Sequence, residues 1–149
     1  MELMKISSPA FANKTEIPAK YTCDGEDVNP PLHIENIPAG TKSLALIVED
    51  PDAPSGLWTH WALWNINPHQ GEISEDSVPR EAVAGKNDFH RNSYGGPCPP
   101  SGTHRYFFKV FALDTVLGLA GSEGREALEK AMDQHLLAQA SLVGVYGKK

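Results

Sequence analysis

Two short segments rich in proline and glycine each lead directly into a histidine, and these histidines are the residues best suited to chemistry. The first segment, residues 50–56 (DPDAPSG), precedes Trp58 and His60. The second, residues 95–102 (GGPCPPSG), precedes His104. Proline restricts the backbone and glycine permits tight turns, so we expect both segments to be rigid loops, where proteins often place binding groups.

The side chains near these loops fit an anion-binding site. They supply two imidazoles, two carboxylates, a guanidinium and a phenol, from His60, His104, Asp50, Asp52, Arg105 and Tyr106. A histidine whose one ring nitrogen bonds a carboxylate presents its other nitrogen outward, and the nearby negative charge favours an imidazolium that attracts anions. Because strand side chains alternate, Tyr106 shares the face of His104, whereas Arg105 points away as a structural ion-pair partner. The alternative is that both histidines are satisfied core residues, and spacing alone does not decide.

Other polar residues carry weaker signals. We expect His69 and His90 to be exposed loop residues, His33 to lie on a short strand and His135 to be a core residue on the apolar face of a helix. The sequence has no HxH or HExxH pattern for a metal and no GxSxG motif for a serine hydrolase. It therefore predicts neither a metal site nor a cofactor.

The chain has two cysteines, Cys23 and Cys98, too few and too far apart for a zinc site of the paired-cysteine type. They can be two separate buried thiols, a disulfide, or one thiol lining a pocket. Reduced thiols are the default expectation in a cytosolic protein.

Length and charge narrow the class of protein. The chain has 149 residues, 40% hydrophobic and 21% charged, which predicts one domain spanning residues 1–149. A net charge of -6 without a basic block argues against a nucleic-acid partner. The N-terminus lacks a signal-peptide pattern, and no apolar run approaches the roughly 20 residues of a membrane span. We therefore expect a soluble, cytoplasmic protein.

The hydrophobic pattern predicts a mainly β fold. Short apolar runs between turn residues predict strands at residues 32–35, 43–49, 59–66 and 106–113. Leu128, Met132 and Leu136 recur at helical spacing, which predicts a helix over residues 123–140 with Ser122 as its N-cap. A final strand is expected at residues 141–146. This order indicates a β-sandwich with one late helix.

The motifs DPDAPSG…THW and GGPCPPSGTHRY resemble the two signature regions of the phosphatidylethanolamine-binding protein family, also called Raf kinase inhibitor-like proteins. Flanking stretches resemble the short prokaryotic branch of that family, namely residues 17–32, 38–54, 106–114 and 127–147. The resemblance thus covers most of the chain.

The resemblance implies two antiparallel sheets in a Greek-key-like sandwich, a helix near the C-terminus, and a pocket for phosphate, phosphorylethanolamine or similar anions. By motif, the ligand-binding residues are Asp50, His60, Gly96, Cys98, His104 and Tyr106, supported by Asp52, Pro54, Trp58 and Arg105. Asp52 is expected to stabilise its loop, and Pro54 stands where the family often has a cis peptide bond.

Two functions follow from these expectations. The preferred one is a non-catalytic module that binds a small phosphorylated or carboxylated ligand and modulates a kinase or other partner protein. The alternative is a hydrolase that uses a His/Asp pair as general acid and base. The short prokaryotic branch is also compatible with a homodimer.

Overall fold

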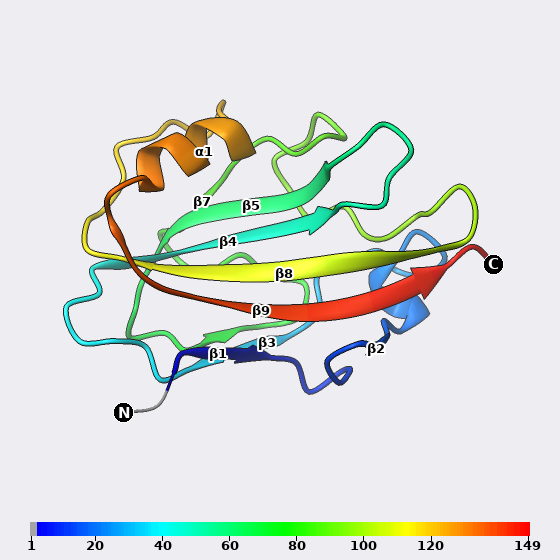
Figure 1. The fold of residues 1–149 in the computed structure, drawn as a ribbon, viewed down its shortest axis with the longest axis horizontal. Helices are drawn as coiled ribbons and strands as arrows, with labels where there is room; N and C mark the ends of the chain where they lie inside the picture. Colours follow the sequence, from blue (N-terminus) through cyan, green and yellow to red (C-terminus); the bar gives the residue numbers. More distant parts are fainter. Residues whose placement is uncertain (1–2) are drawn as a thin grey trace.

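The computed structural model describes residues 3–149 as two β-sheets with one α-helix on the outside (Figure 1). In spatial order the larger sheet comprises β2 (Thr15–Glu16), β9 (Leu136–Gly147), β8 (Thr103–Leu113), β4 (Ser43–Asp50), β5 (Trp58–Ile66) and β7 (Val83–Ala84). The smaller sheet comprises β1 (Lys5–Ser7), β3 (Leu32–Glu35) and β6 (Glu72–Ile73). Within the described chain every paired strand is antiparallel except β2, which runs parallel to β9. The expected mainly β, two-sheet fold is confirmed.

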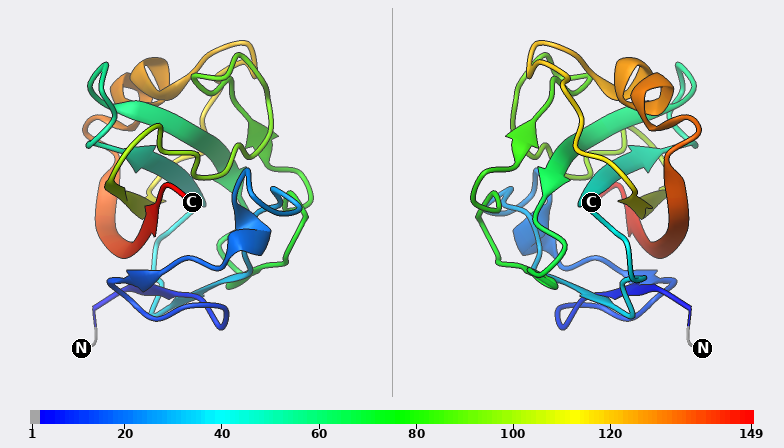
Figure 2. Two further views of the ribbon diagram at one scale, coloured as in Figure 1. Left: turned by 90° about the vertical axis from the view of Figure 1, so that its right-hand side faces the viewer. Right: turned by 90° about the vertical axis from the view of Figure 1, so that its left-hand side faces the viewer.

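The apolar run of β4 is explained by burial on both of its faces. Leu44, Leu46 and Val48 pack in the core between the two sheets, whereas Ala45 and Ile47 pack under α1 (Arg125–Met132). Figure 2 shows α1 outside the larger sheet, with β1 and β3 across from it. A strand covered on both sides needs apolar residues at nearly every position, which is why β4 was predictable from sequence.

The helix is shorter than expected, and the strand after it is longer. The prediction of a helix over residues 123–140 is wrong, because α1 ends at Met132 and β9 begins at Leu136. From Leu136 to Gly147, β9 pairs with β8 along its whole length. These backbone hydrogen bonds stabilise a strand where the spacing of the leucines favours a helix. Gln134, with a positive φ of 68°, turns the chain between α1 and β9. His135 follows α1 rather than lying on its apolar face, and its half-exposed ring bonds Asp114.

The start of α1 also differs from the prediction. Its N-cap is Gly124 rather than Ser122. The backbone N–H of Lys86 donates to the Glu123 carbonyl, and a Cβ on Gly124 would lie 2.9 Å from the Lys86 carbonyl oxygen. This close pairing of the two segments fixes residue 124 as glycine and places the helix start there.

The topology brings the two proline-rich loops to one end of the larger sheet. β4 and β8 are antiparallel neighbours, with Glu49 opposite Phe107. The loop after β4 and the loop before β8 therefore lie side by side, at the right-hand end of the sheet in Figure 1. At this end the short 3-10 helix η1 (Ala19–Tyr21) also packs.

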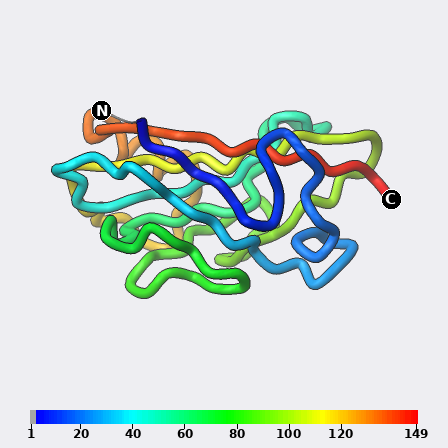
Figure 3. Tube along the Cα trace, turned by 90° about the horizontal axis from the view of Figure 1, so that it is seen from below, coloured from blue at the N-terminus to red at the C-terminus, as the bar shows by residue number. Residues whose placement is uncertain are grey.

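The N-terminal part of the chain lies along the edge of the larger sheet that β2 and β9 form. Seen from below in Figure 3, β1 passes close to β9, and β2 extends the sheet beyond β9. No helix among residues 3–149 combines the length and the apolar character that crossing a membrane requires.

Candidate functional site

A cavity of about 350 Å³ lies between the two proline-rich loops, and we call it the two-histidine cavity. It is lined by Asp50, Ala53, Pro54, Ser55, Trp58, His60, Phe89, Cys98, Pro99, Pro100, His104 and Tyr106. The structure thus brings together residues from both signature regions. Gly96, Asp52 and Arg105 lie outside the lining.

His104 is held by a buried carboxylate. Its Nδ1 lies 2.7 Å from Oδ2 of Asp50, and the residues are 7% and 3% exposed. A carboxylate only accepts hydrogen bonds, so Nδ1 carries a hydrogen and Nε2 is the free ring nitrogen. The other carboxylate oxygen of Asp50 accepts the backbone N–H of Asp52, which fixes the acid in turn. This is the His–Asp pairing that the sequence suggested.

His60 is fixed differently, by a backbone carbonyl. Its Nδ1 lies 2.7 Å from the carbonyl oxygen of Gly95, and the ring packs edge-on against Phe89 and Tyr106. Burial lowers the pKa of His60, although the Gly95 carbonyl and the Asp50 charge act in the opposite direction. His60 is therefore a neutral imidazole at pH 7.

The Nε2 atoms of both histidines and the hydroxyl of Tyr106 are open to the cavity. Among residues 3–149 the only fully buried side-chain nitrogen or oxygen without a hydrogen bond is Nε1 of Trp61. The described protein offers no hydrogen-bond partner to these three cavity atoms, so each must retain contact with the cavity space. Burial and the nearby Asp50 charge raise the pKa of Tyr106, so its hydroxyl stays protonated.

Arg105 and Asp52 brace the rim from outside. Arg105 Nε and Nη2 donate to the two carboxylate oxygens of Asp52 at 2.9 and 2.8 Å, and the Arg105 backbone N–H donates as well. The Arg105 hydrogen bonds lower the pKa of Asp52 to about 2. The prediction that Arg105 points away from the cavity as an ion-pair partner agrees with this geometry.

The loop before β8 is tied to the rest of the chain by a disulfide and a glycine contact. Cys98 is bonded to Cys23, so the expectation of reduced thiols is wrong. The backbone N–H of Cys23 also donates to the Pro97 carbonyl, which brings the two segments within bonding reach. Gly96 donates its N–H to Asp27 and lies so close to Tyr21 that a Cβ would be 2.3 Å from that residue's carbonyl oxygen. Its N–H is thus engaged away from the cavity.

The loop after β4 differs from one further expectation. No cis peptide bond occurs among residues 3–149, so the bond before Pro54 is trans. The chain reverses instead through Gly56, which has a φ of +104° and donates its N–H to the Ala53 carbonyl. Glycine tolerates this left-handed conformation, and the loop closes without a cis proline.

Sequence reasoning missed part of the cavity wall. Phe89 packs against both Trp58 and His60, and it comes from a loop that no motif marked. Pro99 and Pro100 were visible as part of a rigid loop but were not assigned a contact. Only the three-dimensional meeting of the segments reveals these apolar walls.

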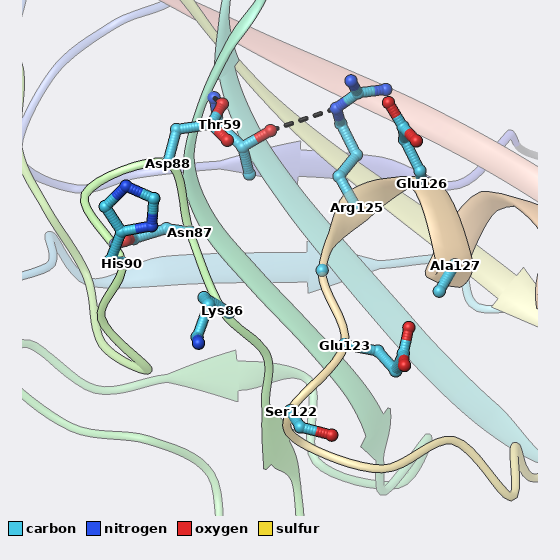
Figure 4. Close-up of a pocket in the computed structure, with 11 residues that line it drawn as sticks. Thr59, Lys86, Asn87, Asp88, His90, Ser122, Glu123, Arg125, Glu126 and Ala127 are labelled. Atoms are coloured by element: carbon cyan, nitrogen blue, oxygen red, sulfur yellow. Dashed lines mark hydrogen bonds between the residues drawn. The ribbon is translucent and has the colours of Figure 1, made fainter.

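A second cavity, of about 340 Å³, lies at the start of α1, and we call it the helix-end cavity (Figure 4). Its lining comprises Thr59, Lys86, Asn87, Asp88, His90, Ser122, Glu123, Gly124, Arg125, Glu126 and Ala127. Arg125 donates to the Thr59 hydroxyl at 3.0 Å and to Glu129 at 2.6 Å. Asp88 accepts the Thr59 backbone N–H, so Arg125, Thr59 and Asp88 are hydrogen-bonded within the protein.

Metal ligation finds no support in the described residues. Across residues 3–149, no three His, Cys, Asp or Glu side chains converge on a common point that could hold a metal ion. The two-histidine cavity therefore offers hydrogen-bonding chemistry from imidazole, phenol and carboxylate groups.

A cavity with apolar walls and a few convergent polar groups, such as the one between these two loops, is the usual form of a small-molecule site. Residues 7–147 match the family described as phosphatidylethanolamine-binding protein, and this chain belongs to that family. A UPF0098 protein of Pyrococcus abyssi is 50% identical, covering 99% of this chain and 87% of the relative. A UPF0098 protein of Methanothermobacter thermautotrophicus is 47% identical, with 96% and 98% covered.

Solved structures agree with this assignment. A phosphatidylethanolamine-binding protein homologue from Chlamydia trachomatis superposes with a TM-score of 0.95 at 41% identity, covering 99% of each chain. Escherichia coli YbcL, described as a member of the mammalian family, superposes with a TM-score of 0.93 at 30% identity, covering 99% of this chain and all of that one. The resemblance to the prokaryotic branch is therefore confirmed.

Proposed function

We propose that this protein binds a small phosphorylated or carboxylated molecule in the two-histidine cavity. The observation that carries the proposal is the pair His60 and His104, each with Nδ1 fixed by the protein and Nε2 lacking a partner in the described chain. Buried polar groups are nearly always hydrogen-bonded in folded proteins. Open polar atoms on the floor of a cavity are therefore suited to a ligand.

The walls of the cavity support a ligand with an organic part. The polar atoms form its floor, while Trp58, Phe89, Pro99 and Pro100 provide apolar surface around it. The Cys23–Cys98 disulfide and the prolines hold one wall in place before binding. Preorganisation of this kind lowers the entropic cost of capturing a small molecule.

Backbone amide NMR during titration with phosphate and then phosphorylethanolamine tests this proposal. We expect shifts confined to residues 50–60 and 95–106 at millimolar ligand, lost in His104→Ala. His90→Ala is a matched control, because it removes a histidine from the helix-end cavity only. Shifts at residues 86–90 and 122–127 instead would move the site to that cavity, and no shift in either region would refute the proposal.

A hydrolase is the second candidate, and the Asp50–His104 contact is the observation that favours it. A histidine oriented by a buried acid can act as a general base toward water. Cys98 is engaged in the disulfide and supplies no thiolate nucleophile. Turnover of a phosphate ester or acyl ester that disappears in both His60→Ala and His104→Ala, with folding retained, would favour this candidate over simple binding.

The remaining expectations about partners stay predictions: modulation of a kinase or other protein, a cytoplasmic location, and a homodimer. The outer edge of β9 supports the last of these. Val143 and Val145 direct their backbone groups away from β8 toward the N-terminal segment, so Gln139 and Ser141 point the same way by alternation. Within the described chain no strand pairs with these two residues on this outer edge, although β1 passes close to β9, and pairing with a second copy would use this part of the edge.

A further inference from the structure

The two histidines on the floor of the two-histidine cavity offer a ligand different hydrogen-bonding atoms. The Gly95 carbonyl can only accept, so Nδ1 of His60 must carry the hydrogen. Because the neutral ring has one N–H, Nε2 of His60 faces the cavity as a lone pair. His60 is therefore a hydrogen-bond acceptor toward any ligand.

Protonating His60 would place a positive charge in an unfavourable position. The ring is 3% exposed, its Nδ1 already faces the neutral Gly95 carbonyl, the Gly96 backbone acts on it as well, and it makes T-shaped contacts with the rings of Phe89 and Tyr106. The charged groups that act on it are Asp50 on β4 and, farther away, Asp27 in the loop after η1. His104 differs, because its Nδ1 faces a carboxylate, that of Asp50 at 2.7 Å, rather than a neutral carbonyl.

The cavity contains no lysine or arginine, so it cannot hold an anion by cationic side chains alone. The available donors are the Tyr106 hydroxyl and, in its imidazolium form, Nε2 of His104. An oxyanion without hydrogen would direct a negative oxygen at the His60 lone pair. One that carries a hydroxyl would instead donate to His60 and accept from Tyr106 and His104, so that every polar atom is paired.

We propose that the two-histidine cavity selects oxyanions that carry a proton, namely hydrogen phosphate and singly protonated phosphate monoesters, over isosteric anions that carry none, such as sulfate. This proposal rests on the proposed function and narrows its ligand class. Sites whose polar groups need a ligand hydrogen reject analogues that lack it, because the mismatch leaves a buried group unpaired. The apolar walls at Trp58 and Phe89 accommodate the ester group of a monoester.

The test compares inorganic phosphate with sulfate at pH 7 and equal ionic strength, by NMR titration of the intact, disulfide-bonded protein. Both anions are tetrahedral and of similar size, and the hydrogen phosphate dianion carries the same charge as sulfate, so this pair differs mainly in the hydroxyl hydrogen. We expect phosphate to bind at least about tenfold more tightly than sulfate. Equal affinities at the same loops would overturn the selectivity while leaving anion binding intact. Failure of both anions to shift these loops would overturn both proposals.

Two variants assign the selectivity to His60. In His60→Gln the amide can rotate to offer either an N–H donor or an oxygen acceptor, so the preference for phosphate over sulfate should fall severalfold. Tyr106→Phe removes a donor used by both anions and should weaken both while leaving their ratio unchanged. An unchanged ratio in a folded His60→Gln, or a loss of the preference in Tyr106→Phe, would contradict the assignment.

Discussion

The two-histidine cavity and the helix-end cavity have nearly the same volume, about 350 and 340 Å³, but they differ in whether their buried or half-buried polar side chains are hydrogen-bonded within the protein. In the helix-end cavity, Arg125, Thr59 and Asp88 bond one another or nearby groups. In the two-histidine cavity, His60 and His104 each keep one nitrogen without a partner in the described chain. Among the buried or half-buried polar side chains, unfilled hydrogen-bonding capacity therefore distinguishes the two cavities, whereas volume does not.

The difference also extends to the way each cavity is built. At the helix-end cavity, side-chain and backbone hydrogen bonds connect Thr59 and Lys86 to the start of α1. One wall of the two-histidine cavity is held covalently by the Cys23–Cys98 disulfide. A site that must keep two imidazoles open gains from walls that cannot collapse onto them.

Of the changes that test this difference between the cavities, removing the disulfide is expected to have the largest effect on the free energy of unfolding. Because the two cysteines are 75 positions apart, the bond restricts a long loop in the unfolded chain, and Cys23→Ser with Cys98→Ser should lower the free energy of unfolding by about 2–4 kcal/mol. Urea denaturation measures the loss. Amide shifts in the folded variant should concentrate around Cys23 and in residues 95–104 and spare residues 86–90. An unchanged free energy would show that the wall is held by packing alone.

The sequence predicted those parts of the fold and site that depend on local signals. β4 is apolar from Leu44 to Val48 because both faces are buried, and β8 shows a similar run. Asp50, His60, His104 and Tyr106 were marked because each stands beside a rigid loop or follows one by alternation along a strand. For such residues, the position predicted from the neighbouring sequence agrees with the position in the structure.

The remaining features depend on contacts between distant segments. β9 forms because β8 offers it a full-length partner, which no periodicity within residues 136–140 reveals. The disulfide depends on Cys23 and Cys98 meeting at one end of the larger sheet. Phe89 reaches the cavity from a loop fixed by Asn87, whose side chain bonds the His60 carbonyl and nearby backbone groups.

A smaller effect should come from Arg125→Ala in the helix-end cavity. Arg125 is mostly buried and bonds the hydroxyl of Thr59, so its loss should lower the free energy of unfolding by about 1–2 kcal/mol. Phosphate affinity should stay within about twofold of wild type, since the site lies elsewhere. Lys86→Ala, which removes an exposed side chain from the same cavity, is the control and should change neither quantity. A large loss of phosphate affinity in Arg125→Ala would instead make the helix-end cavity part of the binding site.

The smallest effect is expected from Asp52→Asn. This variant tests the role of Asp52 separately from that of Asp50, the nearby acid that bonds His104. Asp52 has a pKa of about 2 in the folded protein against an ordinary value of 3.8, because Arg105 donates hydrogen bonds to its charged form. Between these two values the unfolded chain binds more protons than the folded one, so stability falls as the pH drops from about 4 to about 2. The Asn variant should show a shallower fall in thermal unfolding temperature over this range. The difference should be small, because exposed ion pairs contribute little.

Phosphate titration of the same variant makes the comparison between Asp52 and Asp50 direct. Asp52 faces Arg105 at the rim, whereas Asp50 faces His104 in the cavity. Asp52→Asn should therefore leave phosphate affinity near wild type at pH 7, while Asp50→Asn should weaken it strongly, because the Asp50 carboxylate is the group that orients the His104 ring through Nδ1. Equal losses in the two variants would mean that the rim ion pair shapes the cavity as much as the buried acid does. An identical acid response in Asp52→Asn and wild type would show that the Arg105 contact does not persist in solution.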